Sequence, residues 1–181
     1  METSRHFTAA PWPTSLKVSS VLGTILLAGA GIASYRAIPV FSGFTHAFGL
    51  AVSLLLPVLL AGSIFSTVTG YEVSSTDLTV QRLLWASHIS LVGLRRVFPD
   101  PSVCRGSTRI IGNAGLFGFT GLYQNKQFGR FRLFATDLTH SVVLVLPERT
   151  VVITPAAAEA FVAHIRHIFP AASTAAAGAV A

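Results

Sequence analysis

The chain has 181 residues, of which 51% are hydrophobic and 11% charged, and its formal net charge is +6. An ordinary soluble domain carries about 25% charged residues, so this composition is typical of a membrane protein, and the spread of its basic residues suits an anionic membrane surface better than a nucleic-acid groove. A single cysteine, Cys104, excludes an intrachain disulfide framework and a cysteine-based zinc site, and it fits a reducing compartment.

The N-terminal region combines a polar segment, 1–17, with an apolar run, 18–35. The polar segment has no periodic pattern, so no element is predicted there. The apolar run is just long enough to span a bilayer, and a second apolar run follows closely, which favours a transmembrane helix. A secretory signal stays open as the alternative, because Arg5 and Lys17 precede the run and Ala-Gly-Ala at 28–30 resembles a cleavage site.

The second apolar run covers 47–69 and contains no Asp, Glu, Lys, Arg or His. At about 1.5 Å per helical residue it reaches roughly 35 Å, which exceeds the ~30 Å hydrocarbon core of a bilayer. Pro57 near its middle predicts a kinked spanning helix, because the carbonyl that proline leaves free can be satisfied locally in lipid.

The connection between the two runs, 36–45, is short, so an antiparallel helical hairpin is expected, with Pro39 and Gly43 as turn formers. Two pairs of small residues are spaced four apart, Gly29 with Ala33 and Ala47 with Ala51. They could let the helix backbones approach closely. The alternative is that they only fill the apolar run and have no role in packing. The connection contains only Arg36, whereas basic residues are more frequent in the flanking segments, at Arg5, Lys17, Arg82, Arg95 and Arg96. Both termini are therefore predicted to be cytoplasmic.

From Tyr71 onward the hydrophobic pattern changes to a two-residue period, which predicts β-strands. One hairpin is expected to join YEVS to LTVQRLL across 75–77, and another to join FTGLYQN to GRFRLFAT across 125–129. Turn residues break the pattern at 95–101 and 147–150. Further strands are predicted in HISLVGL, in SVVLVL and in VVI, and the total is about seven.

A C-terminal helix is predicted after the strands, with Thr154 as its N-cap and Pro155 as its first residue. Its apolar stripe consists of residues three or four apart, Ala158, Phe161, Ile165 and Ile168, so the helix is expected to pack against a sheet. Pro170 ends the helix. The remaining segment, 170–181, is expected to be a disordered, Ala-rich tail.

Several segments of this region resemble the bacterial pleckstrin-homology (PH) domain family, among them GNAGLFG at 112–118, LFATD at 133–137 and VITP at 152–155 with Phe161 after them. The resemblance covers about 71–169. Together with the two apolar runs, it implies a two-helix transmembrane hairpin followed by an α+β PH-like domain, with about seven antiparallel strands in a bent sheet or barrel capped by one C-terminal helix. The domains expected are then 1–17, 18–69, 70–169 and 170–181. Apolar strands and turn glycines indicate a fold rather than a chemistry.

No motif predicts catalysis or a cofactor. Gly112, Gly115, Gly118 and Gly121 lack the GxxxxGK[ST] pattern of a phosphate loop, so a structural role in a bent sheet is preferred. His164 and His167 share a helix face without a third ligand, so no metal site is predicted. The fold could bring His88, His140 and Asp137 around Cys104, but nothing in their spacing requires it, and an incidental cysteine is preferred.

The most concentrated basic residues flank one loop region and are the candidate lipid-facing or partner-facing residues: Arg95, Arg96, Arg105 and Arg109. Near an anionic leaflet each could contribute about 1 kcal/mol. The alternative is a solvated edge that keeps sheet edges from pairing. Arg130 and Arg132 alternate with apolar residues and are expected on the wet face of one strand.

The expected function is that of a non-enzymatic, membrane-anchored interaction or scaffold module at the cytoplasmic face of the bacterial cytoplasmic membrane. It would bind a protein partner or assemble with itself, without a cofactor and without nucleic acid. The alternative is an anionic-lipid-sensing module that uses the basic loop. A third class, an oligomeric channel or transporter subunit, has less support because neither apolar run carries an ionisable residue.

Overall fold

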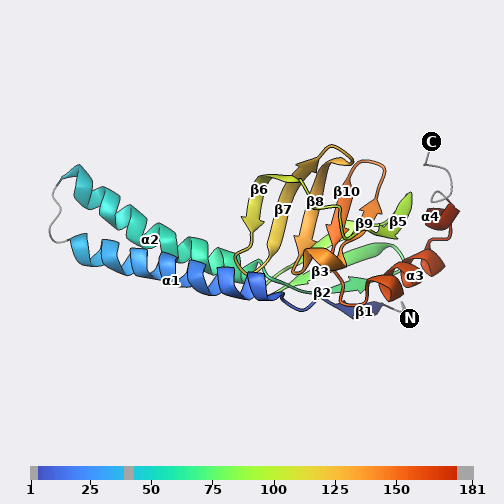
Figure 1. Ribbon diagram of the computed structural model, residues 1–181, viewed down its shortest axis with the longest axis horizontal. Helices are drawn as coiled ribbons and strands as arrows, with labels where there is room; N and C mark the ends of the chain where they lie inside the picture. Colours follow the sequence, from blue (N-terminus) through green and yellow to red (C-terminus); the bar gives the residue numbers. More distant parts are fainter. Residues whose placement is uncertain (1–3, 39–42, 175–181) are drawn as a thin grey trace.

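The computed structural model describes residues 4–38 and 43–174. Two long helices, α1 (Thr14–Ala37) and α2 (Phe44–Phe65), run antiparallel and extend from one end of a strand-rich domain (Figure 1). The predicted helical hairpin is confirmed, with Gly43 at a φ of +59° immediately before α2 and Pro39 outside the described residues. The second helix ends earlier than predicted, because the β-branched Val68 and Thr69 belong to a strand instead.

Both helices are long and apolar enough to cross a membrane, and little of their surface is buried. Large apolar side chains stay exposed along them, including Leu22, Leu26, Leu54 and Val58. A core helix of a soluble domain would cover such side chains, so their exposure suggests membrane association.

The helices approach each other closely where Gly31 of α1 faces Pro57 of α2, since a Cβ at Gly31 would lie 3.8 Å from the proline Cδ. A Cβ at Gly29, in contrast, would have no atom within 4 Å, and the other small residues of the predicted pairs are exposed: Ala33, Ala47 and Ala51. The prediction that these pairs bring the helices together is therefore wrong, because they lie on the outer faces of the hairpin.

The domain contains two sheets. The first has the order β1-β2-β3-β4 and is antiparallel throughout, with β1 at Arg5–Thr8, β2 at Val68–Val73, β3 at Asp77–Arg82 and β4 at Ala86–Ser90. The second has the order β5-β9-β10-β8-β7-β6, with β5 at Arg96–Pro99, β6 at Thr108–Ala114, β7 at Phe119–Asn125, β8 at Gly129–Ala135, β9 at Val142–Val145 and β10 at Thr150–Ile153. β6 is the edge nearest the hairpin (Figure 1).

The predicted strand arrangement is confirmed only in part. Both predicted hairpins form, as β2–β3 and β7–β8. The described residues nevertheless contain ten strands rather than about seven, in two open sheets rather than one bent sheet or barrel. The pairing is also not antiparallel throughout, because β10 lies between β9 and β8 and runs parallel to β8. The short 3₁₀ helix η2 (Leu138–His140) connects β8 to β9 in the chain, and β10 pairs between these two strands in the sheet.

The main core lies between the sheets and helix α3 (Ala158–Ile168). The predicted apolar stripe is confirmed, since Phe161 and Ile165 are fully buried and Ala158 and Ile168 pack against the same core. The predicted N-cap is wrong. The helix begins at Ala158, and the Thr154 hydroxyl instead accepts a hydrogen bond from the backbone N–H of Thr136 at 3.0 Å.

The start of the predicted disordered tail also differs from the prediction. A short helix, α4 (Ala171–Thr174), follows α3, and Ala172 is buried in the main core. The low bulk of the segment therefore does not prevent burial here. Residues 175–181 lie outside the described residues.

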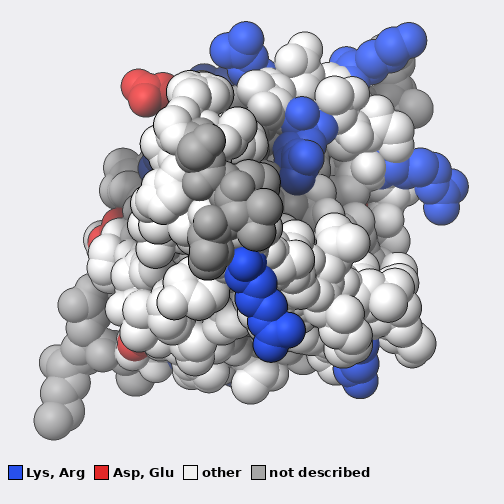
Figure 2. Space-filling view, turned by 90° about the vertical axis from the view of Figure 1, so that its left-hand side faces the viewer, with Lys and Arg blue, Asp and Glu red and all other residues white. Residues whose placement is uncertain are grey.

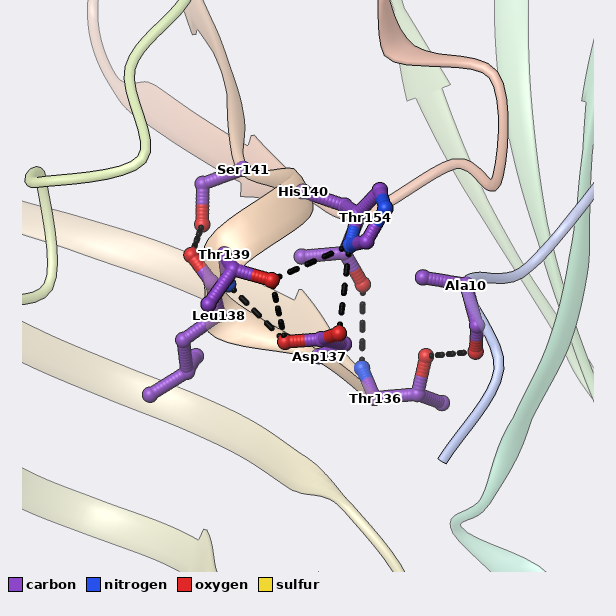
Figure 3. A network of polar contacts seen from close by, with 8 residues as sticks. All are labelled: Ala10, Thr136, Asp137, Leu138, Thr139, His140, Ser141 and Thr154. Atoms are coloured by element: carbon purple, nitrogen blue, oxygen red, sulfur yellow. Dashed lines mark hydrogen bonds and ion pairs between the residues drawn. The ribbon is translucent and has the colours of Figure 1, made fainter. Parts of the chain in front are cut away.

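The polar N-terminal segment forms part of the domain, which its sequence did not predict. β1 pairs with β2, and Phe7 packs edge to face on Phe161 with ring centroids 5.0 Å apart. Beyond β1, the Thr136 hydroxyl donates to the Ala10 carbonyl at 2.6 Å (Figure 3). The Ala10 N–H donates to the Thr154 carbonyl at 2.8 Å. These buried contacts hold the chain immediately before α1 begins.

Candidate functional site

The four predicted arginines do not form one cluster. Arg95 and Arg96 lie at β5 and Arg109 lies on β6, which are opposite edges of the six-stranded sheet. Five strand spacings of about 4.8 Å separate these edges, or about 24 Å. Arg105 lies in the turn region between the two strands. Only Arg109 therefore lies near the hairpin.

Arg109 belongs instead to a cleft of about 830 Å³ between the hairpin and the domain, which we call the junction cleft. One wall is the last two turns of α2 and the residue that caps them, through Val58, Leu59, Gly62, Ser63 and Ser66. The opposite wall comes from β3, β4, β6, β7 and β8, and includes Ser87, Ile111, Asn113, Thr120, Leu122 and Phe134. The cleft thus lies between a membrane-type helix and the faces of both sheets that point toward the main core, as the buried Phe134 shows.

Three arginines line the junction cleft, Arg82 from β3, Arg109 from β6 and Arg132 from β8. The Arg109 guanidinium donates to the Gly112 carbonyl at 3.1 Å, and the Arg82 guanidinium lies 5.1 Å from the Phe134 ring centroid and 5.6 Å from that of Trp85. Partial burial and the neighbouring charge of Arg132 both lower the pKa of Arg82. Of the described residues that line the cleft, none is Asp or Glu.

The glycine series has the structural role that was predicted, with positive φ angles and close backbone approach, and two of its members line the cleft. Gly112 and Gly121 face each other across β6 and β7, and both line the cleft. A Cβ on Gly112 would overlap the Thr120 carbonyl oxygen, and a Cβ on Gly121 would overlap that of Ile111. Both residues also have positive φ angles, +122° and +143°. Only glycine allows the two strands to approach this closely.

The domain surface around the cleft is both apolar and basic. The β3–β4 turn lies level with the end of α2, because Arg82 pairs with Val68, three residues after that helix. This turn exposes Leu83, Leu84 and Trp85, and β6 exposes Ile110 and Ile111. Figure 2 views the molecule from the hairpin end, where Lys and Arg side chains spread over the face and Asp and Glu side chains are visible only near its left margin.

Among the described residues, the histidines considered as bases for Cys104 make hydrogen bonds with other side chains. Burial raises the pKa of the Cys104 thiol to about 11, and the nearby charge of Asp100 adds to this shift, so the thiol stays protonated at neutral pH. His88 contacts the Thr79 hydroxyl in the first sheet. His140 contacts Asp137 at 3.1 Å within a local turn that also includes Thr139 (Figure 3).

Asp137 has a structural role in that turn. Burial opposes its ionisation, but hydrogen bonds from the Thr139 backbone and hydroxyl and the charge of His140 outweigh this cost and hold the pKa of the carboxyl below its usual value. The carboxylate accepts from the Thr139 N–H at 3.0 Å, which closes η2 after β8. This geometry resembles a cap, and it leaves the carboxylate occupied by its own turn.

The histidine pair on α3 has no third ligand within the described part of the chain, where no group of three metal-binding side chains occurs. The His164 ring lies 5.6 Å from the Phe7 ring. Burial, followed by the charges of Arg5 and His167, lowers the pKa of His164. Its environment is therefore that of a packing residue beside β1.

Arg82 and Arg132 are the two cleft arginines that were not among the site residues predicted from the sequence. Arg132 alternates with apolar residues, as expected on an ordinary solvent-exposed strand face. Arg82 was considered only as a positive charge close to the membrane. One local signal does point to Arg82, since it directly precedes the apolar Leu83-Leu84-Trp85 turn. Nothing local connects it to Arg109 or Arg132, because Arg82 belongs to the other sheet and the three side chains meet only at the cleft.

Comparison with known proteins agrees with this architecture. Residues 69–168, just over half of the chain, match the family described as Bacterial PH domain. No match was found among curated proteins or among solved structures.

Proposed function

Because this chain belongs to the bacterial PH domain family, we propose that it is a non-catalytic interaction module, anchored by the α1–α2 hairpin in the cytoplasmic membrane of a bacterium. The domain and both helix ends attached to it lie on one side, and the distribution of Lys and Arg favours the cytoplasmic side for them. The raised pKa of Cys104, the contact of His88 with Thr79 and the contact of His140 with Asp137 support a role without nucleophilic catalysis.

The observation that carries this proposal is the direct attachment of the domain to both helices of the hairpin. Only Ser66 and Thr67 separate α2 from β2. On the other helix, the Ser19 hydroxyl donates to the Gly115 carbonyl at 2.6 Å, and the Ser20 hydroxyl accepts from the Phe117 N–H at 2.9 Å. The β6–β7 turn is thus fastened to α1, and the domain presents one fixed set of surfaces at the membrane.

These contacts also bear on the secretory-signal alternative. Cleavage after residue 30 would remove β1 from the sheet and Phe7 from the main core. It would also remove the two serines that fasten the β6–β7 turn. Retention of the first helix is therefore part of the proposal.

The surface offered to a protein partner or a second copy is the edge of β4. This strand is the last of the four-stranded sheet, and its outer edge has no paired strand among the described residues. An exposed edge can accept an extended segment through backbone hydrogen bonds. At the β5 edge of the other sheet, α3 and α4 lie alongside the strand, so that edge is less open.

Site-specific photocrosslinking tests the proposal in native membranes. A photoreactive amino acid replaces Ser90 at the end of β4, and the matched control replaces Lys126 in the β7–β8 turn; both residues are exposed. We expect a discrete crosslinked product from position 90 and none from position 126. A strictly monomeric protein in proteoliposomes, with no product from either position in cells, would refute the proposal.

A second candidate, an anionic-lipid-binding module, is favoured by the basic face at the hairpin end (Figure 2). The arginines that support it are not those of the predicted basic loop, since Arg95 and Arg96 lie at the edge of the sheet far from the hairpin.

A further inference from the structure

We propose that the junction cleft binds one anionic glycerophospholipid, with its phosphate among Arg82, Arg109 and Arg132 and its acyl chains along α2. The inference rests on the membrane attachment proposed above and deepens the lipid-binding candidate. It names a site that the four predicted arginines did not indicate.

The positive charge of the cleft favours the binding of an anion. Three guanidinium groups line it, and none of the described lining residues is acidic. Among the described residues, no arginine forms an ion pair with a carboxylate. The Nε atom of Arg82 is buried and has no hydrogen-bond partner among them. A phosphate supplies acceptors for several guanidinium donors at once and relieves the repulsion between the like charges.

The shape of the cleft favours a lipid over a soluble phosphate. Val58 and Leu59 form one wall, and they belong to the apolar surface of α2 that would face acyl chains. The arginines lie on the domain wall opposite. One ligand with a charged head and apolar chains satisfies both walls, whereas a soluble phosphate leaves the apolar wall uncovered. A volume of about 830 Å³ is sufficient for a headgroup and the first part of its chains.

The position of the cleft matches the headgroup level of a bilayer. Both helices have serines near the ends that adjoin the domain. These are Ser19 and Ser20 on α1 and Ser63 and Ser66 at the end of α2. Beside the cleft, Trp85 is 45% exposed and follows two exposed leucines. Tryptophan prefers the interface between headgroups and hydrocarbon, so this turn is suited to lie there. A lipid could then enter the cleft sideways from the inner leaflet.

Native mass spectrometry of the full chain in neutral detergent measures this binding directly. The protein is titrated with phosphatidylglycerol, with phosphatidylcholine or with glycerol 3-phosphate. We expect one phosphatidylglycerol to bind saturably, at least tenfold more tightly than phosphatidylcholine, and not to be displaced by glycerol 3-phosphate. Equal affinity for the two lipids would refute the proposal. Displacement by glycerol 3-phosphate would also refute it, because the site would then accept a soluble phosphate.

Two matched pairs of variants locate the site. The double variant Arg109→Gln with Arg132→Gln is expected to bind phosphatidylglycerol about 30-fold more weakly, which corresponds to about 2 kcal/mol, or ~1 kcal/mol for each arginine. Its control, Arg95→Gln with Arg96→Gln, removes the same charge at the far edge and should stay within about twofold of the wild type. Equal weakening in both would indicate diffuse attraction and overturn the assignment.

The second pair tests the shape of the cleft without changing its charge. Gly62 lines the cleft and has no atom within 4 Å of its would-be Cβ, so Gly62→Leu should fill the space and abolish saturable binding. Gly29→Leu on the outer face of α1 has the same open surroundings and should bind normally. Retained binding in Gly62→Leu refutes the proposal even if an arginine variant fails to fold. A β4 crosslink that persists without lipid binding would overturn this inference alone.

Discussion

Replacing Phe7 with alanine tests whether the polar N-terminal segment is part of the domain core. Phe7 is 8% exposed and meets Phe161 at a ring-centroid distance of 5.0 Å and an interplanar angle of 71°. Loss of a buried phenylalanine costs about 3–5 kcal/mol, which includes the cavity that it leaves. Because β1 is an edge strand, we expect the lower part of that range, about 3 kcal/mol of unfolding free energy.

Urea unfolding of the full chain in nonionic micelles, followed by tryptophan fluorescence, measures this change. The matched control is Phe44→Ala, since Phe44 is 84% exposed and its replacement should alter the unfolding free energy by less than about 0.5 kcal/mol. A double-mutant cycle with Phe161→Ala should give a coupling of about 1 kcal/mol for the ring pair. An effect of Phe7→Ala no larger than that of the control would show that β1 does not contribute to the core, and the reasoning would fail.

Three further predictions concern thiol chemistry, membrane topology and strand geometry. Burial raises the pKa of Cys104 from 9.0 to about 11, so its thiolate fraction at pH 7 is about 100-fold lower and a maleimide should label it correspondingly more slowly until the protein is denatured. Labelling of native protein at the rate of denatured protein would contradict this. For topology, Lys126→Cys in a Cys104→Ser background is the better probe, and an impermeant maleimide should label it only after cells are permeabilised. Gly121→Ala should lower the unfolding free energy by more than about 1 kcal/mol, because its Cβ would overlap a carbonyl across the strand pair. Gly129→Ala controls for positive φ alone, since its Cβ would meet nothing within 4 Å, and an equal effect of the two changes would rule out the overlap.

Elements with a strong local pattern could be predicted from the chain. The β7–β8 hairpin forms across 125–129 as expected, because alternating strands flank residues that favour a turn. The apolar stripe of α3 is likewise correct, since the three-to-four spacing leaves one face to bury. The predicted cap at Thr154 is wrong, because its hydroxyl accepts a hydrogen bond from Thr136 across the sheet.

The candidate site was much less predictable. β1 has only four residues, RHFT, and one apolar side chain directed to the core, which is too little for a periodic signal. The grouping of Arg95 and Arg96 with Arg109 assumes that proximity in the chain means proximity in space. The strand order places them at opposite edges of the six-stranded sheet. Arg109 lines a cleft with Arg132 of the same sheet and with Arg82 of the other sheet instead.

Local properties of the chain are enough to establish that two helices can span a bilayer and that a strand-rich domain with one packed helix follows them. The quantities involved are the length of an apolar run and the period of its side chains, and both can be measured within one segment. The assembled fold was needed to learn which strands are neighbours, that the N-terminal segment completes the first sheet and that three distant arginines share a cleft beside α2. Those outcomes depend on which faces bury each other, and that choice is settled by the free energy of the assembled core and not by any one segment.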